Sequence, residues 1–311
     1  RRAAERRAQA ADYRELAADD RRAAARDREQ AAQERLDALG DREALAAEIE
    51  HQRARHRQAV RHQHRAQELA ETLQRSLTPP RLPRIAGLDV AVHHEPFGLA
   101  EVGGDFYDLF ALARHRAGFF FGDVCGKGPR AAAITALARY TMRTAAMLHE
   151  TPAAVLGDLN AALHVEATDP PTTCTAVYGQ IDMSGPTASI TLAVGGHPPP
   201  LVIRADGSVE TTPARGLILG AVDEPVFQTC ELRFDVGDAL VVYSDGILDA
   251  VTDGVPVDEE RISDVLAEVP HASATDLVGA LLGSMRRIDR ALRDDVAFIA
   301  LRHVGARGSS S

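Results

Sequence analysis

The sequence predicts an α+β fold in which stacked antiparallel sheets carry helices on their outer faces, after a long helical segment. Strand-like apolar runs follow one another from residue 88 onward, joined by turns such as Ala205-Asp206-Gly207-Ser208. The later helical runs come in two pairs instead of alternating with strands. Consecutive strands favour antiparallel pairing, whereas strict alternation would predict a parallel sheet. Residues 1–77 contain no proline and are rich in helix-forming residues.

The N-terminal segment 1–77 is predicted to be helical, with a break near Gly40-Asp41. After the break, a set of positions follows the 4-3 spacing of a heptad, apolar at both ends and polar in the middle. These seam positions are Leu45, Ile49, Gln52, His56, Ala59, Gln63, Ala66, Ala70, Leu73 and Leu77. Such a weak heptad predicts a coiled-coil linker that forms a homodimer, and a single solvated helix packed on the next domain is the alternative.

The prolines in Thr78-Pro79-Pro80-Arg81-Leu82-Pro83 end the helix, because proline lacks the N–H donor and biases the preceding residue away from helical geometry. The second domain is predicted to span residues 78–304, with a flexible tail at 305–311. The predicted strands cover residues 88–93, 106–112, 118–124, 174–181, 188–194, 201–203, 226–234, 239–243 and 296–301. The predicted helices cover residues 130–148, 152–166, 258–269 and 273–292.

Composition excludes several classes of protein. The net charge is −10, and acidic and basic residues nearly cancel in residues 1–77, so the excess acid lies in the second domain and argues against a nucleic-acid partner. Three cysteines with no C-x-x-C pair favour a reducing cytoplasm over a disulfide framework or zinc ribbon. No apolar run reaches membrane-span length, since the best candidate contains Arg139 and Arg143. The chain starts without methionine, so we expect it to be part of a longer protein.

Four aspartates, most of them beside glycine, are the strongest functional signal. They are Asp105, Asp123, Asp245 and Asp294, and three of them open or close an apolar run. A buried carboxylate is costly unless it has a cation or a metal as a partner, and glycine lets the backbone come close to that partner. Converging carboxylates without matching histidines or cysteines favour Mg²⁺ or Mn²⁺ over zinc. Four unrelated turn aspartates are the alternative.

Several motifs then occur in a fixed order between residues 73 and 303. They are Leu73-Gln74-Arg75-Ser76-Leu77, Val102-Gly103-Gly104-Asp105-Phe106-Tyr107-Asp108, Gly122-Asp123-Val124-Cys125-Gly126-Lys127-Gly128, Gly196-His197-Pro198-Pro199, Tyr243-Ser244-Asp245-Gly246 and Asp294-Asp295-Val296. In this order and spacing the chain resembles the SpoIIE-like (RsbU-like) branch of the metal-dependent 2C-type serine/threonine protein phosphatases. The resemblance implies a four-layer α-β-β-α sandwich with a two-metal site at one end of the paired sheets.

The resemblance also implies roles for individual residues. Asp123 would bridge two Mn²⁺ or Mg²⁺ ions, with the Val124 carbonyl on one of them. Asp245 and Asp294 would hold the other ion, and Asp105 would contact the cluster directly or through water. Such ions activate a water molecule as the nucleophile, so no protein nucleophile is needed.

Some positions depart from the family pattern. Many 2C-type enzymes have a histidine two residues after the bridging aspartate, where this chain has Cys125, so the general acid stays open. His197 is a weak substitute, because its Gly-His-Pro-Pro turn could equally fix backbone geometry. Lys127 could contact phosphate or cap the following helix, and Asp295 and Asp108 could orient ligands or waters from outside the metal shell, with surface solvation as the alternative.

Other phosphate-handling classes fail on spacing. A cysteine phosphatase needs five residues between its cysteine and arginine, but only four separate Cys125 from Arg130. A Walker loop needs one more residue between Gly122 and Gly126, and Gly128 stands where its hydroxyl residue belongs.

The sequence therefore predicts a cytoplasmic phosphatase acting on phosphoserine or phosphothreonine in a protein. By resemblance, its substrate is a phosphorylated anti-anti-sigma-factor-type protein of a bacterial partner-switching pathway. An upstream sensor, a regulatory role for the N-terminal helix and a switching element at residues 130–166 are further implications. A pseudophosphatase that binds a phosphoprotein without hydrolysing it is the alternative function.

Overall fold

The computed structural model describes residues 30, 33, 49–53, 55–58, 60–61, 82–95, 104–166, 172–185, 187–248, 251–252, 255–285 and 295–305. The chain divides into two compact units, Arg1–Arg65 and Ala66–Ser311. In the first unit the described residues are α-helical and exposed, as the composition predicts. Most seam positions lie outside the described residues, so the coiled coil, its dimer and the domain boundary at residue 77 stay predictions.

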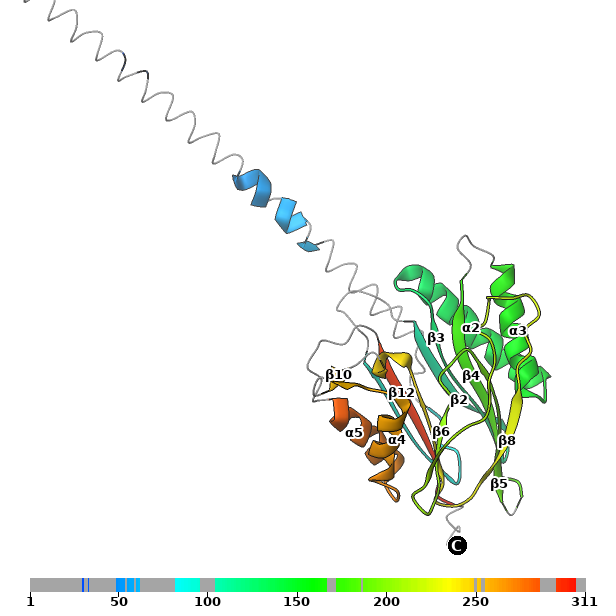
Figure 1. Ribbon diagram of the computed structural model, residues 1–311. Coiled ribbons are helices and arrows are strands. Elements are labelled where there is room, and N and C mark those ends of the chain that lie inside the picture. The colour runs from blue at the N-terminus through cyan, green and yellow to red at the C-terminus, as the bar shows by residue number, and fades with distance from the viewer. Residues whose placement is uncertain are drawn as a thin grey trace, which may run out of the picture. The chain divides into compact units, whose positions relative to one another are not determined.

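The second unit is built on two five-stranded sheets in which every neighbouring pair of strands is antiparallel (Figure 1). The first sheet has the order β1 (Leu88–Glu95), β12 (Val296–His303), β9 (Ala239–Tyr243), β6 (Leu201–Ile203) and β7 (Val209–Thr211). The second sheet has the order β2 (Asp105–Ala113), β3 (Arg116–Val124), β4 (Cys174–Asp182), β5 (Ala188–Gly195) and β8 (Thr229–Phe234).

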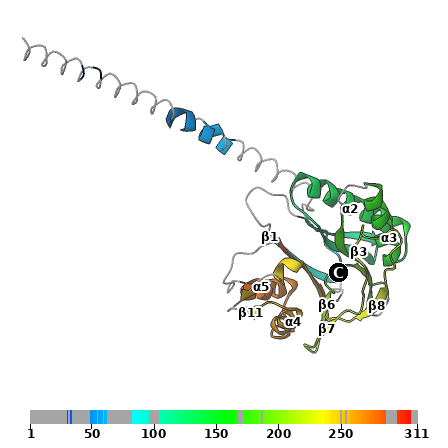
Figure 2. The same ribbon diagram turned by 45° about the horizontal axis from the view of Figure 1, so that its top comes forward.

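Helices cover the outer face of each sheet, which completes four layers (Figure 2). The helices α2 (Pro129–Leu148) and α3 (Pro152–Val165) pack on the second sheet. The helices α4 (Glu259–Ala267) and α5 (Ala274–Met285) pack on the first sheet. The α-β-β-α sandwich is therefore confirmed.

Three apolar layers hold this arrangement together. The run Phe119-Phe120-Phe121 in β3 shows how they form, because side chains alternate across a strand. Phe119 and Phe121 are buried between the two sheets, whereas Phe120 is buried beneath α2 and α3. On the other side, Phe298 of β12 is buried beneath α4 and α5. A near-continuous apolar strand is what a sheet covered on both faces requires.

The structure differs from the prediction at weakly patterned places. The predicted strand at 226–234 begins at Thr229, since Val226 is 81% exposed and follows a proline. The short strands β7, β10 (Val251–Thr252) and β11 (Val255–Pro256) were not predicted. Each is too short to show a period of two. No helix in the described part of the chain is both long and apolar enough to cross a bilayer.

Candidate metal centre

Two of the predicted ligands face each other where β2 begins and β3 ends. The antiparallel register places Asp105 directly opposite Asp123, and Asp105 is only 5% exposed. Like charges opposite each other destabilise a strand pair, and burial of a carboxylate adds to that cost. A cation bound between the two carboxylates would offset both the repulsion and the cost of burial.

The backbone at Gly104 leaves no room for a side chain on this side of the pair. A Cβ atom added at Gly104 would lie 2.2 Å from Oδ1 of Asp123 and 2.4 Å from the carbonyl oxygen of Val124. The amide of Val124 in turn donates to the carbonyl of Gly104 over 3.1 Å. Glycine thus lets hard oxygen donors crowd together, and this donor set fits Mg²⁺ or Mn²⁺.

The first sheet contributes its residues through a hydrogen-bonded turn. Ser244 ends β9, and its amide donates to the carbonyl of Ala297 over 3.0 Å, while its hydroxyl accepts from the amide of Ala297 over 2.9 Å. The same hydroxyl donates to the backbone carbonyl of Asp295 over 3.3 Å. Asp245, in the 3-10 turn that follows, is therefore held beside the start of β12.

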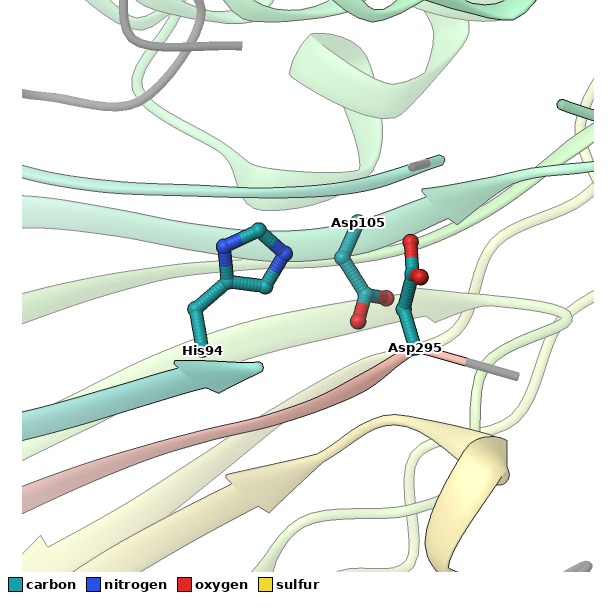
Figure 3. A group of neighbouring side chains, drawn as sticks. All are labelled: His94, Asp105 and Asp295. Atoms are coloured by element: carbon teal, nitrogen blue, oxygen red, sulfur yellow. The ribbon is translucent and has the colours of Figure 1, made fainter. Parts of the chain in front are cut away.

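His94, Asp105 and Asp295 form a cluster that the sequence analysis did not anticipate. One potential ligand atom from each lies within 4.8 Å of those of the other two. Asp105 belongs to the second sheet, whereas His94 is the penultimate residue of β1 and Asp295 precedes β12 in the first sheet, so the cluster spans the sandwich (Figure 3). Burial lowers the pKa of His94, although the nearby charge of Asp295 partly opposes this, so the neutral imidazole is favoured.

His197 is buried and bridges the two sheets. Its Nδ1 lies 2.9 Å from the hydroxyl of Thr175 in β4, and its Nε2 lies 3.1 Å from the carbonyl oxygen of Tyr243 in β9. A carbonyl only accepts, so Nε2 carries the proton and Nδ1 accepts from Thr175. Burial lowers the pKa of His197 to about 3. The structure thus supports the geometric role for His197 and not that of a general acid.

Asp108, considered as an orienting residue beside the metals, instead connects β2 to α2. Its carboxylate lies 3.4 Å from Arg139 and 2.9 Å from Arg143, and it also accepts from the amide of Leu109 over 2.9 Å. The Thr135 hydroxyl of α2 donates to the carbonyl of Gly104 over 3.5 Å. The predicted switching helix therefore contacts the strand that carries Asp105.

The remaining candidates lie at the surface or outside the described residues. Lys127 and Cys125 are exposed and line a pocket of about 190 Å³ together with Arg130, a cation that the motifs did not single out. Asp294 lies outside the described residues, so its predicted role stays a prediction.

Solved structures share this architecture. The SiaA-PP2C domain of Pseudomonas aeruginosa superposes with a TM-score of 0.68 at 21% identity, over 78% of this chain and 97% of that one. The RsbU and RsbW domains of Rv1364c from Mycobacterium tuberculosis give a TM-score of 0.58 at 26% identity, over 71% of this chain and 61% of that one. The two-sheet sandwich is thus the fold of PP2C-type domains.

Sequence similarity assigns the chain to one family within this fold. The family described as Stage II sporulation protein E (SpoIIE) matches residues 113–304, and the chain belongs to this family. Over 76% of its length it is 25% identical to phosphoserine phosphatase RsbU of Bacillus subtilis, and over 75% it is 27% identical to phosphoserine phosphatase RsbP of the same organism. It spans 69% of the length of RsbU and 56% of that of RsbP.

Proposed function

We propose that this protein is a metal-dependent phosphatase that hydrolyses phosphoserine or phosphothreonine in a protein substrate. The observation that carries the proposal is the pairing of Asp105 with Asp123 against Gly104, because it brings carboxylate and carbonyl oxygens together at one end of the sandwich. The names of RsbU and RsbP support phosphoserine as the substrate group.

Five groups would hold two divalent ions, Mn²⁺ or Mg²⁺. They are the carboxylates of Asp105, Asp123, Asp245 and Asp294 and the carbonyl of Val124. When bound, the ions would supply an activated water molecule and polarise the phosphate. The short aspartate side chains would hold the ions, while Lys127 and Arg130 at the neighbouring pocket would attract the dianionic phosphate.

No cysteine nucleophile is part of this mechanism. Cys174 is buried, and burial raises the pKa of its thiol far above the usual range, so it stays protonated. Cys125 is exposed beside Lys127, but the activated water makes a covalent phosphoenzyme unnecessary.

We also propose a substrate class, a pathway and a role for the N-terminal segment. The substrate class is a phosphorylated anti-anti-sigma-factor-type protein in a bacterial partner-switching pathway, in the cytoplasm. Residues 1–77 would form a homodimeric linker to an upstream sensor, and residues 78–304 would form the phosphatase domain.

Phosphate release from a phosphoserine peptide, with and without Mn²⁺ or Mg²⁺, tests the function. We expect activity only with metal, and Asp123→Asn or Asp105→Asn should lower it by about a hundredfold or more, since each removes a ligand charge. The matched control is Asp206→Asn in an exposed surface turn, which should leave the rate unchanged. Binding of the phosphopeptide without hydrolysis would instead support the pseudophosphatase.

A further inference from the structure

We propose that His94 is a nitrogen ligand of the metal centre, acting beside Asp105 and Asp295, and that it makes the centre prefer Mn²⁺ to Mg²⁺. The inference rests on the proposed function only in assuming that the centre binds a divalent ion. It adds a residue that no motif contains and a nitrogen donor that would strengthen the preference for Mn²⁺ over Mg²⁺.

The first argument is position. In the register of β1 with β12, His94 lies opposite Ala297, close to Asp295 at the start of β12. Asp105 approaches from the second sheet, and the imidazole ring of His94 points toward both carboxylates (Figure 3). Donor atoms bound to one ion at about 2.1 Å are at most about 4.2 Å apart. The observed limit of 4.8 Å is within a small side-chain movement of that spacing.

The second argument is the state of the ring nitrogen. Nε2 of His94 is buried and has no hydrogen-bond partner in the described part of the chain. Buried polar atoms nearly always have a partner, so an exception needs an explanation. An edge contact with the Tyr107 ring, whose centroid lies 6.2 Å from that of His94, supplies none. A metal ion would accept the lone pair of this nitrogen.

Ligand chemistry then sets the metal preference. Mg²⁺ takes oxygen ligands in a near-ideal octahedron and dehydrates reluctantly. First-row transition ions accept imidazole nitrogen more readily. Replacing one oxygen donor by imidazole therefore favours Mn²⁺ over Mg²⁺ in the same set of carboxylates.

Pulsed electron paramagnetic resonance of the Mn²⁺-loaded protein tests the bond directly. The wild-type protein should show hyperfine coupling to ¹⁴N, replaced by ¹⁵N coupling when its histidines are ¹⁵N-labelled. His94→Ala and His94→Gln should lose the coupling, and their Mn²⁺ affinity should fall by about tenfold or more while Mg²⁺ affinity changes less than about threefold. The control is His93→Ala, because Nε2 of the neighbouring His93 is also buried without a hydrogen-bond partner in the described part of the chain but lies outside the cluster. This variant should keep the coupling.

Three outcomes would overturn the inference. They are a wild-type protein that does not bind Mn²⁺, a wild-type spectrum without histidine nitrogen coupling, and coupling that persists in both His94 variants. Phosphate release measured in parallel separates the two proposals. Hydrolysis without nitrogen coupling would contradict the role of His94 and support the phosphatase function. Nitrogen coupling without hydrolysis would support the role of His94 and contradict the phosphatase function. Circular dichroism of each variant shows whether it is folded.

Discussion

Gly104 is the residue with the least freedom to change at the metal centre. Gly104→Ala would place a methyl group against Asp123 and the carbonyl of Val124, both of which are held by the β2–β3 pair. We expect metal-dependent phosphate release to fall by about tenfold or more, because a displacement of about 1 Å at reacting groups costs that much or more. Mn²⁺ titration should show weakened binding.

A second glycine provides the matched control for this substitution. Gly157 lies within α3, and a Cβ atom there meets nothing within 4 Å. Gly157→Ala should raise the free energy of unfolding by about 0.5–1 kcal/mol, since alanine loses less backbone entropy in a helix. Its phosphate release should match that of the wild type. Equal activity of both alanine variants would contradict the close approach at Gly104.

The buried imidazole of His197 predicts a pH dependence of stability. Its pKa is about 3 in the folded protein, against about 6.5 in the unfolded chain. Between these pH values the unfolded chain binds one proton more than the folded protein. The contribution of His197 to the free energy of unfolding is therefore complete above pH 6.5 and is lost as the pH falls toward 3. From pH 7 to pH 5 the loss is about 2 kcal/mol by this linkage.

Urea unfolding at the two pH values measures that loss. His197→Gln has no group that titrates in this range, so it should be less stable than the wild type at pH 7 but should lose about 2 kcal/mol less on going to pH 5. Equal losses in the two proteins would show that the histidine titrates normally.

At the scale of elements, α2 is anchored to β2 by the buried carboxylate of Asp108. The side chain of Arg139 is only 10% exposed, whereas that of Arg143 is 47% exposed. Loss of Arg139 leaves the buried Asp108 carboxylate with only the half-exposed Arg143 of the two, whose charge is screened by water, whereas loss of Arg143 leaves the buried Arg139–Asp108 pair in place. The two arginines therefore offer a matched comparison on one helix.

Arg139→Ala should lower the free energy of unfolding by about 3 kcal/mol. Arg143→Ala should cost about 1 kcal/mol, which includes the loss of its contact over the Phe110 ring at 5.1 Å. Chemical denaturation of both variants measures the difference. A larger cost for Arg143 would mean that the exposed pair dominates.

The elements also show which parts of the fold local patterns can predict. The run Phe119-Phe120-Phe121 is continuously apolar, and α2 and α3 are long segments rich in apolar residues that each begin at a proline, so the sequence predicts all three within a few residues of their observed bounds. β7 has three residues with exposed or half-buried side chains, so it exists because of its neighbour β6 and not because of its own pattern. Weakly patterned elements depend on tertiary pairing that a local window does not contain.

The same distinction applies to the candidate site. The family resemblance assigns Asp105 and Asp123 to one metal site, and the strand register places the two residues opposite each other, while their role as ligands stays a prediction. His94 was missed because its two neighbours are not glycines and no motif includes it. Its position depends on the pairing of β1 with a strand about 200 residues further on, and only the fold supplies that information.

For the whole molecule, the N-terminal segment predicts an association that depends on its polar seam. Gln52 and His56 are helical and exposed in the described part of the first unit. Replacing Gln52, His56 and Gln63 by leucine should stabilise a dimer, because each fully buried leucine contributes about 1.5–3 kcal/mol. If the linker carries a signal, phosphate release should change as well.

Sedimentation together with phosphate release measures both effects. Gln58→Leu, at a position off the seam, is the control and should leave association unchanged. A protein that starts at Leu77 should be monomeric. A triple variant that stays monomeric, or that dimerises with unchanged kinetics, would reduce the segment to a tether.

The proposed metal centre would take its donors from both sheets, and this has a thermodynamic consequence. Asp105 lies on one sheet, while His94 and Asp295 lie at strand ends of the other. Ion occupancy and the relative placement of the sheets are thus linked functions, and each must bias the other by the same free energy. Anything that shifts one sheet by a fraction of an ångström at this edge changes the affinity for the ion. Equally, in the proposed metal-bound state the concentration of the free divalent ion would set how firmly the two halves of the sandwich are held together.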